Sequence, residues 1–220
     1  MAVPGEHHPA FEEYCETIFE LREDDLDVIQ ARIADRLRVS RPSVSEMIKR
    51  MSDESLIEVA GGRITLTVTG EELAVRVVRR HRIAERFITD ILGLSWSLAH
   101  REAGRWEHVM SHEVETAMSR LLGEPTTCPH GNPIPGSGYT PPSAKKLSEL
   151  SSGQEFTVSR IPEELEFTPG MLEFLENSHL VPGSHGTVQI GAEAGDMTVL
   201  IDGTSVTVDS FATVRILVTI

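Results

Sequence analysis

The strongest constraint on this chain is a concentration of His and Glu at helical spacing between Val75 and His112. His81 and Glu85 are four residues apart, so they share one face of a helix. A second set, spaced by four, three and one, consists of His100, Gly104, Glu107 and His108. Solvated amphipathic helices also carry charged faces. However, imidazole and carboxylate are the ligands that divalent cations take, so two such helices side by side predict a metal site.

Composition indicates a soluble globular protein. The 220 residues are enough for one or two domains, and 40% of them are hydrophobic. The sequence contains no run of about 18 apolar residues. It has two cysteines, Cys15 and Cys128, which are too few for a disulfide framework and are expected to be free thiols. We therefore expect a cytoplasmic protein with no membrane partner.

The net charge of −14 is unevenly distributed. Between Gln30 and Arg82 there are eleven Lys or Arg against seven Asp or Glu, a local net charge of +4, so the rest of the chain carries −18. A basic segment in an acidic protein is typical of a DNA-binding unit with acidic accessory parts, although a chance cluster would have the same composition.

The basic segment contains a predicted helix-turn-helix. An amphipathic helix over residues 9–22 is followed by helices over residues 26–37 and 42–51. Ser40 is the expected N-cap of the last helix, where Pro42 is tolerated in the first turn. A helix pair without a DNA role is the alternative. For DNA binding, the residues available to bases and phosphates are Ser40, Arg41, Pro42, Ser43, Ser45, Glu46, Lys49 and Arg50.

A predicted β-hairpin follows this helix directly. The sequence LIEVAGGRITLTVT has two short β segments around Gly61-Gly62, and Arg63 near the tip is placed to meet a phosphate. A hairpin in this position is a wing, which predicts a winged-helix DNA-binding domain over residues 1–73.

Residues 74–140 are predicted to form a helical dimerisation and metal-binding domain. Their apolar residues, Trp96 and Trp106 among them, exceed what a thin helical layer can bury, which favours a dimer interface. Near the end of this region Cys128 and His130 are two residues apart between prolines. Because no second ligand pair lies nearby in the sequence, we expect these two residues to have a structural role in a loop.

The remaining chain divides into a linker and a β-rich domain. Residues 141–153 continue a stretch rich in Pro, Gly and Ser and are predicted to be a flexible linker. Residues 154–220 contain several short β runs separated by turns, the pattern of a small β-barrel. Glu163 and Glu166 follow the first of these strands.

The order of these segments resembles the diphtheria toxin repressor family of iron- and manganese-dependent transcriptional repressors. The resemblance rests on ARIADRLRVSRPSVSEMIKRM, LTVTG, RRHRIAERFITDILGL, HREAGRWEHVMSHEVE and HGNPIPG, and extends in pattern to an SH3-like C-terminal domain. It implies a homodimer that binds palindromic operator DNA when divalent metal is bound, and it allows two dimers on one operator. It also implies two metal sites per subunit: one formed by His81, Glu85, His100, Glu163 and Glu166, the other by Glu13, Glu16, Gly104, Glu107 and His108.

Two positions depart from the iron-sensing pattern of the family, which has Met where Glu13 stands and Cys where Gly104 stands. Glu13 and Glu16 instead reproduce the carboxylate pair of the manganese sensors, although those also carry Glu at the position of Gly104. A site rich in oxygen ligands suits Mn(II), so we favour Mn(II), with Fe(II) as the alternative. A metallohydrolase or a metal buffer would use the same ligand types, but no HExxH motif is present.

Overall fold

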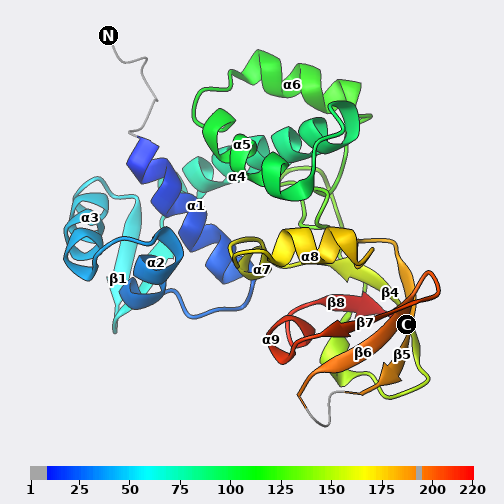
Figure 1. Ribbon diagram of the computed structural model, residues 1–220. Coiled ribbons are helices and arrows are strands. Elements are labelled where there is room, and N and C mark those ends of the chain that lie inside the picture. Colours follow the sequence, from blue (N-terminus) through cyan, green and yellow to red (C-terminus); the bar gives the residue numbers. More distant parts are fainter. Residues whose placement is uncertain (1–8, 192–194) are drawn as a thin grey trace.

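The computed structural model describes residues 9–191 and 195–220 (Figure 1). The first eight residues of the predicted DNA-binding domain and residues 192–194 of the predicted C-terminal domain lie outside the described residues. Three hydrophobic cores correspond to an N-terminal unit, a helical unit and a C-terminal sheet domain. Among the described residues, no helix has the length and apolar character needed to cross a membrane.

The N-terminal unit is a winged helix-turn-helix, as predicted. It consists of α1 (Pro9–Glu23), α2 (Gln30–Leu37), α3 (Arg41–Asp53), β1 (Ile57–Ala60) and β2 (Arg63–Leu66). The Ser40 hydroxyl caps α3 by accepting a hydrogen bond from the Ser43 amide at 3.3 Å. Gly61 and Gly62 both have positive φ, which allows the tight turn between the antiparallel strands β1 and β2.

Helix α2 begins four residues later than the apolar pattern predicts. The carbonyl of Val28 accepts a hydrogen bond from the amide of Ile64 at 3.0 Å, so this segment lies beside β2 instead of joining the helix. The apolar spacing of Leu26 and Ile29 fits a helix, but contacts with a distant strand decide the local conformation.

The helical unit lies above α1 in Figure 1. It contains α4 (Val68–Arg86), a π-helical turn η1 (Phe87–Ile91), α5 (Trp96–Trp106) and α6 (His112–Leu121). Gly93, with φ of 67°, ends the π-helical turn, and the Ser111 hydroxyl caps α6 by accepting from the Val114 amide. Helix α4 packs against both α1 and α5, which brings their polar faces together.

The C-terminal domain is an antiparallel sheet with short helices. Its elements are β3 (Lys145–Lys146), η2 (Leu147–Glu149), β4 (Glu155–Arg160), α7 (Glu163–Glu166), α8 (Met171–Asn177), β5 (His185–Ile190), β6 (Met197–Ile201), β7 (Thr204–Val208), α9 (Ser210–Thr213) and β8 (Leu217–Thr219). The strand order is β3-β8-β4-β5-β6-β7. Among the described strands β3 and β7 are unpaired edges, so the expected closed barrel is not seen; barrel closure needs a pairing that neither edge makes.

Residues 145–150, which the sequence assigns to the linker, belong to this sheet domain. Lys145 and Lys146 pair with β8, and Leu147 and Leu150 are buried in the C-terminal core. Their apolar side chains are few and widely spaced among polar residues, so only the tertiary contacts reveal their place.

Trp96 also belongs to the C-terminal core and not to a free surface. The first residue of α5 is only 8% exposed, and its amide donates to the carboxylate of Glu176. The interpretation of Trp96 as a dimer-interface residue is therefore wrong, because the sheet domain of the same chain already covers it. The large apolar residues that do stay exposed in the helical unit are Val68, Ile91, Leu92, Leu94, Val109, Val114 and Leu121.

Candidate metal centres and nucleic-acid interface

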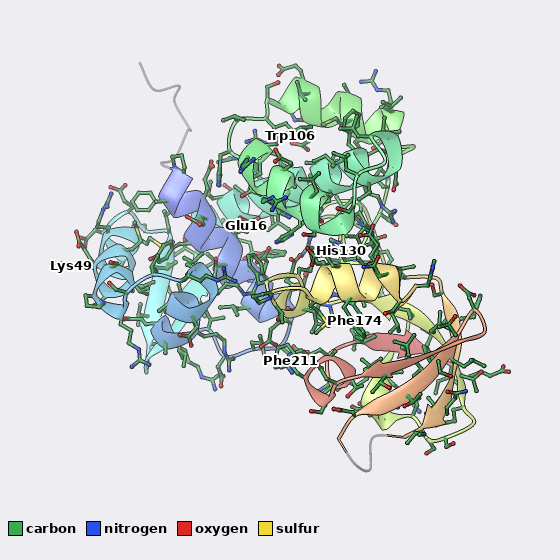
Figure 2. All side chains as sticks on the ribbon, in the orientation of Figure 1. Glu16, Lys49, Trp106, His130, Phe174 and Phe211 are labelled. Carbon is green, nitrogen blue, oxygen red and sulfur yellow. The ribbon has the colours of Figure 1, made fainter. Side chains whose placement is uncertain are left out.

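The predicted His and Glu ligands converge where α1, α4, α5 and α7 meet. In Figure 2, Glu16 on α1 faces the helical unit, and His130 lies between that unit and α8. His81, Glu85, Glu107, Glu163 and Glu166 are all buried at this junction. Four elements distant in sequence thus contribute ionisable groups to one interior region.

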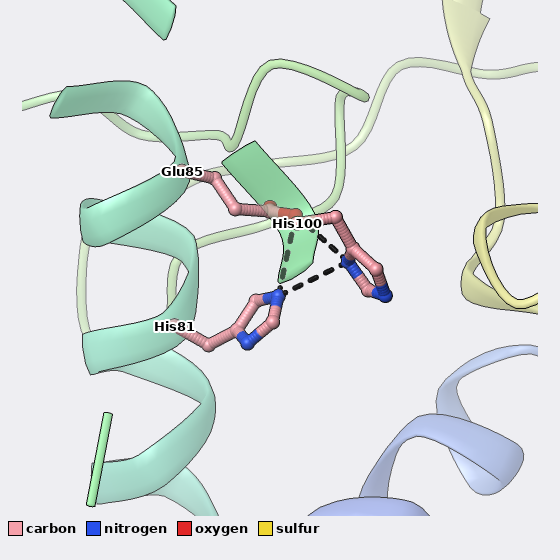
Figure 3. Close-up of side chains that lie close together, drawn as sticks. All are labelled: His81, Glu85 and His100. Carbon is pink, nitrogen blue, oxygen red and sulfur yellow. Dashed lines mark hydrogen bonds and ion pairs between the residues drawn. The ribbon is translucent and has the colours of Figure 1, made fainter. Parts of the chain in front are cut away.

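One group of ligands surrounds Glu85, and we call it the Glu85 centre. The Glu85 Oε1 atom lies 3.2 Å from His81 Nε2 and 3.0 Å from His100 Nδ1 (Figure 3). Glu166 Oε2, from α7 of the C-terminal domain, lies 3.3 Å from the same His100 nitrogen. The predicted set of His81, Glu85, His100 and Glu166 is therefore brought together.

Cys128 and His130 also belong to the Glu85 centre, which the sequence prediction missed. His130 Nδ1 lies 2.7 Å from Glu166 Oε2 and 3.6 Å from Glu85 Oε2, and Cys128 Sγ lies in the same cluster. Both residues are fully buried. A thiol therefore lies in this centre, whereas the expected oxygen-rich site is the one at Glu13 and Gly104. The spacing of Cys128 and His130 alone showed no ligand pair, because their neighbours come from α4 and α7.

Several buried atoms of the Glu85 centre have no hydrogen-bond partner among the described residues. These atoms are Glu85 Oε2, Glu166 Oε2, and both ring nitrogens of His130. Glu166 Oε2 and His130 Nδ1 lie 2.7 Å apart, within ion-pair distance. Buried polar atoms without hydrogen-bond partners are costly, and a bound cation would be a common partner for the oxygens and nitrogens that converge here.

A second group of ligands, which we call the Glu107 centre, lies on the other side of His81. His81 Nδ1 is 2.5 Å from Glu107 Oε2 and 4.0 Å from Glu16 Oε1, while Glu107 Oε1 is 3.2 Å from His108 Nε2. The two nitrogens of the single His81 ring thus face two different centres.

The structure places Glu12, and not Glu13, against His108. Glu12 is buried, and its Oε2 lies 2.8 Å from His108 Nδ1. Glu13 is exposed, at the edge of a cavity that His108 and Glu16 also line. Glu12, Glu16 and Glu20 follow each other at intervals of four, so all three buried carboxylates lie on one face of α1. This spacing was the available signal for Glu12 and Glu20, which the sequence prediction missed.

Gly104 lines this cavity of about 220 Å³ together with Glu13, Glu16 and His108. A Cβ built at Gly104 would meet nothing within 4 Å, so a larger side chain has room there. Gly104 itself can offer only its backbone carbonyl, as predicted from its lack of a side chain.

Burial and mutual repulsion dominate the electrostatics of the Glu107 centre. Burial, followed by the nearby charge of Glu107, raises the pKa of Glu16 well above its usual value. At the Glu85 centre, burial opposes the charged form of Glu85, but His130 and His81 outweigh it and lower the pKa of Glu85 well below its usual value. The two centres therefore hold carboxylates in opposite electrostatic conditions, and a cation would relieve the repulsion between Glu16 and Glu107 directly.

Glu163 lies beside the Glu85 centre but is already engaged. Its Oε1 accepts from the fully buried Arg82 at 2.9 Å, and Arg82 also pairs with Glu23 at 2.7 Å. The other oxygen of Glu163 has no hydrogen-bond partner among the described residues. Glu163 can thus complete a ligand set only while it shares its charge with Arg82.

The predicted DNA-facing residues form an exposed face of α3 and of the wing. Lys49 projects from the outer side of α3, away from the rest of the molecule (Figure 2). Arg63 at the wing is exposed and pairs with Asp27 at 2.9 Å. The other exposed residues of this face are Ser40, Arg41, Pro42, Ser43, Ser45, Glu46 and Arg50. Val44, Ile48 and Met51 are buried on the opposite side, so the helix can present its polar face to a groove.

Comparison with known proteins agrees with the division of the chain into an N-terminal winged helix and a helical unit. Residues 8–63 match the iron dependent repressor N-terminal DNA binding domain, and residues 67–136 match the iron dependent repressor metal binding and dimerisation domain. The iron-dependent repressor IdeR of Mycobacterium leprae is 39% identical over 204 residues, which cover 87% of this chain and 88% of the relative. The diphtheria toxin repressor of Corynebacterium diphtheriae is 48% identical over 126 residues, which cover 57% of this chain and 56% of the relative.

Solved structures show the same likeness over the full fold. A manganese-dependent transcriptional repressor in complex with manganese superimposes with a TM-score of 0.84 at 32% identity, covering 95% of this chain and 99% of that one. Members of the family are DNA-binding transcriptional repressors and not enzymes. With a DNA-binding domain, a metal-binding and dimerisation domain and a C-terminal sheet domain in the same order, this chain belongs to the diphtheria toxin repressor family of iron- and manganese-dependent transcriptional repressors.

Proposed function

We propose that this protein is a repressor of metal-homeostasis genes that Mn(II) activates, with Fe(II) as the alternative metal. The single observation that carries the proposal is the junction at His81, where one cluster of buried carboxylates and imidazoles lies between α1 and the helical unit and a second lies between the helical unit and α7. Buried ionisable groups without partners are costly to keep, so their concentration here indicates a binding function.

Each subunit would hold two metal ions. At the Glu85 centre the proposed ligands are His81, Glu85, His100, Cys128, His130 and Glu166, with Glu163 beside them. This set is larger than one ion needs, so we expect a subset to ligate at any time. At the Glu107 centre the proposed ligands are Glu12, Glu13, Glu16, Glu107, His108 and the carbonyl of Gly104.

The chemistry of the two centres suggests different metal preferences. The Glu107 centre offers only oxygen and imidazole nitrogen, which suits Mn(II). Cys128 adds a thiol to the Glu85 centre, and a thiolate favours softer or later transition metals. We therefore assign the manganese response to the Glu107 centre and expect the Glu85 centre to discriminate less against Fe(II).

Metal binding would affect DNA binding through α1. Glu12 and Glu16 lie on α1, whereas Glu107 and His108 belong to the helical unit, and repulsion among these carboxylates works against their close approach. A bound dication supplies positive charge that neutralises part of this repulsion. The buried face of α1 can then hold the winged helix in one position relative to the dimer helices, and the expected coupling is about 1–3 kcal/mol.

The operator should be palindromic. Two winged helices related by a dimer axis present two α3 helices in equivalent orientations, so each reads one half-site. Two dimers on one operator would extend this arrangement, and the number of dimers bound per duplex can be counted by analytical ultracentrifugation.

The test is operator binding measured by fluorescence anisotropy against free Mn(II) and Fe(II), under anaerobic conditions and with a chelator as the metal-free reference. Glu107→Gln should abolish the manganese response, and Glu85→Gln should weaken it. His185→Gln is the matched control, because His185 is an exposed histidine of β5 whose ring contacts Thr157. Metal-independent DNA binding by the wild-type protein would overturn the proposal.

A further inference from the structure

Phe167 is the residue that immediately follows the candidate ligand Glu166, and it touches two parts of the molecule at once. On one side its ring is edge-on to His100, with centroids 5.1 Å apart. On the other side the Arg36 guanidinium of α2 lies over the ring, 4.4 Å from its centroid. Phe167 accordingly lines both the cavity of the Glu107 centre and a second groove of about 320 Å³ against α2.

The position of Phe167 depends directly on α7. Its amide donates to the carbonyl of Glu163 at 3.2 Å, which closes the last turn of that four-residue helix. Any displacement of Glu163 and Glu166 therefore displaces the Phe167 ring. Helix α7 also packs against α1 (Figure 1), so this short segment of the C-terminal domain is in contact with the winged helix.

Arg36 in turn holds α2 to α1. Its side chain is 5% exposed and pairs with Glu20 at 3.2 Å, and its Nη2 atom has no hydrogen-bond partner among the described residues. The contact with the face of the Phe167 ring therefore offsets part of the cost of burying this guanidinium. Because α2 precedes α3 by a three-residue turn, the position of Arg36 influences the orientation of the DNA-facing helix.

We propose that Phe167 is a positioning residue through which the C-terminal domain transmits metal occupancy to the helix-turn-helix. When Glu163 and Glu166 on α7 bind a metal ion, they place the Phe167 ring against the Arg36 guanidinium. This Phe167–Arg36 contact favours the orientation of α2 and α3 that binds DNA. The C-terminal domain thus acts directly on the DNA-binding unit, in addition to supplying ligands. This inference rests on the proposed metal-dependent function.

The structure offers a matched control. Arg215 lies 3.7 Å from the centroid of Phe211, but both residues belong to the C-terminal domain, so this Arg–Phe pair connects no domains. Phe167 and Phe211 are similarly exposed, 39% and 38%, and both line the groove against α2. Replacing either by Leu should therefore perturb folding equally little.

The experiment measures the ratio of operator affinity at saturating Mn(II) to that in chelator for the full-length protein. Phe167→Leu should lower this ratio about 5- to 30-fold, which corresponds to a cation–π contact of about 1–2 kcal/mol. Phe167→Tyr should restore it, because Tyr also offers a ring face, and Phe211→Leu should leave it unchanged. The number of Mn(II) ions bound per subunit, counted by electron paramagnetic resonance, should stay the same in all variants.

A double-mutant cycle with Arg36→Lys, which keeps the positive charge opposite Glu20, isolates the Phe167–Arg36 contact. The Phe167→Leu, Arg36→Lys double variant should lose no more of the metal-dependent gain in operator affinity than either single variant does. By linkage, operator DNA should raise Mn(II) affinity less in Phe167→Leu than in the wild type, by the same factor. A wild-type ratio in Phe167→Leu overturns the inference, as does a loss of bound Mn(II) that accounts for the whole effect. No metal response in the wild-type protein instead overturns the proposed function itself.

Discussion

At the scale of single residues, we expect two positions at the Glu107 centre to determine its ligand chemistry. Glu13 and Gly104 stand where the iron-sensing pattern of the family has a thioether and a thiol. The cavity has room for a larger side chain at Gly104, and Glu13 at its edge can be replaced without disturbing a buried contact.

The double change Glu13→Met and Gly104→Cys should lower the manganese response relative to that of ferrous iron. Sulfur ligands contribute little to Mn(II) binding, whereas a thiolate favours later transition metals. Loss of a carboxylate weakens attraction for any dication, so the measured quantity is the ratio of half-saturating Mn(II) to half-saturating Fe(II) in operator binding. An unchanged ratio would assign selectivity to the Glu85 centre, where the thiol of Cys128 lies.

Asp24 gives a prediction on pH. Burial raises the pKa of Asp24 to about 7, although the guanidinium of Arg160, 2.7 Å away, works against this rise. Because the folded protein binds this proton more tightly than the unfolded chain does, the contribution of Asp24 to stability is complete below about pH 4 and is lost as pH rises through 7.

Asp24→Asn removes the titration while keeping a similar shape. The difference in free energy of unfolding between the wild type and the variant should therefore fall by about 2 kcal/mol as the pH rises from 4.5 to 7.5. The measurement is urea unfolding of both proteins in chelator at each pH. A difference that does not vary with pH would show that Asp24 titrates normally.

At the scale of elements, α3 has one buried apolar face and one exposed polar face. The exposed cations of the polar face should contact phosphates. Lys49→Ala or Arg50→Ala should weaken binding to all DNA sequences and reduce the slope of log affinity against log salt concentration by about one unit each. Lys145→Ala, in the C-terminal sheet, is the control and should leave the slope as it is. A changed sequence preference with an unchanged slope would contradict the phosphate role.

At the scale of the whole molecule, the exposed apolar residues of the helical unit predict the dimer surface. Leu121 on α6 is 63% exposed, and Val109 before it is also exposed. The wild-type protein should sediment as a dimer at micromolar concentration even without metal, because apolar burial does not depend on the metal.

Leu121→Asp should shift this equilibrium to monomer, because it places a charge in the proposed interface. Ile190→Asp is the matched control, since Ile190 is 60% exposed on β5 of the C-terminal domain, far from this surface in sequence. Sedimentation velocity in chelator distinguishes the outcomes. A metal-free wild-type monomer would be evidence that metal, and not apolar contact, drives dimerisation.

Much of the architecture could be predicted from sequence because local signals suffice for it. The Ser40 cap, the glycine pair of the hairpin and the four-residue spacing of His81 and Glu85 each act within one or two turns of chain. Such patterns predict helices, a wing and which side chains share a face, and they correctly indicated the family. They also showed that α4 and α5 carry ligand types.

Only the tertiary structure decided which ligands share a centre. A loop brings His130 to Glu85 and Glu166, and the rotation of α1 places Glu12, and not the exposed Glu13, against His108. Trp96 is covered by the sheet domain, and Val28 is held beside a strand that follows it by more than thirty residues. The physical reason is the same in each case: burial and pairing with distant residues outweigh local preference, and no local pattern records which distant residues will meet.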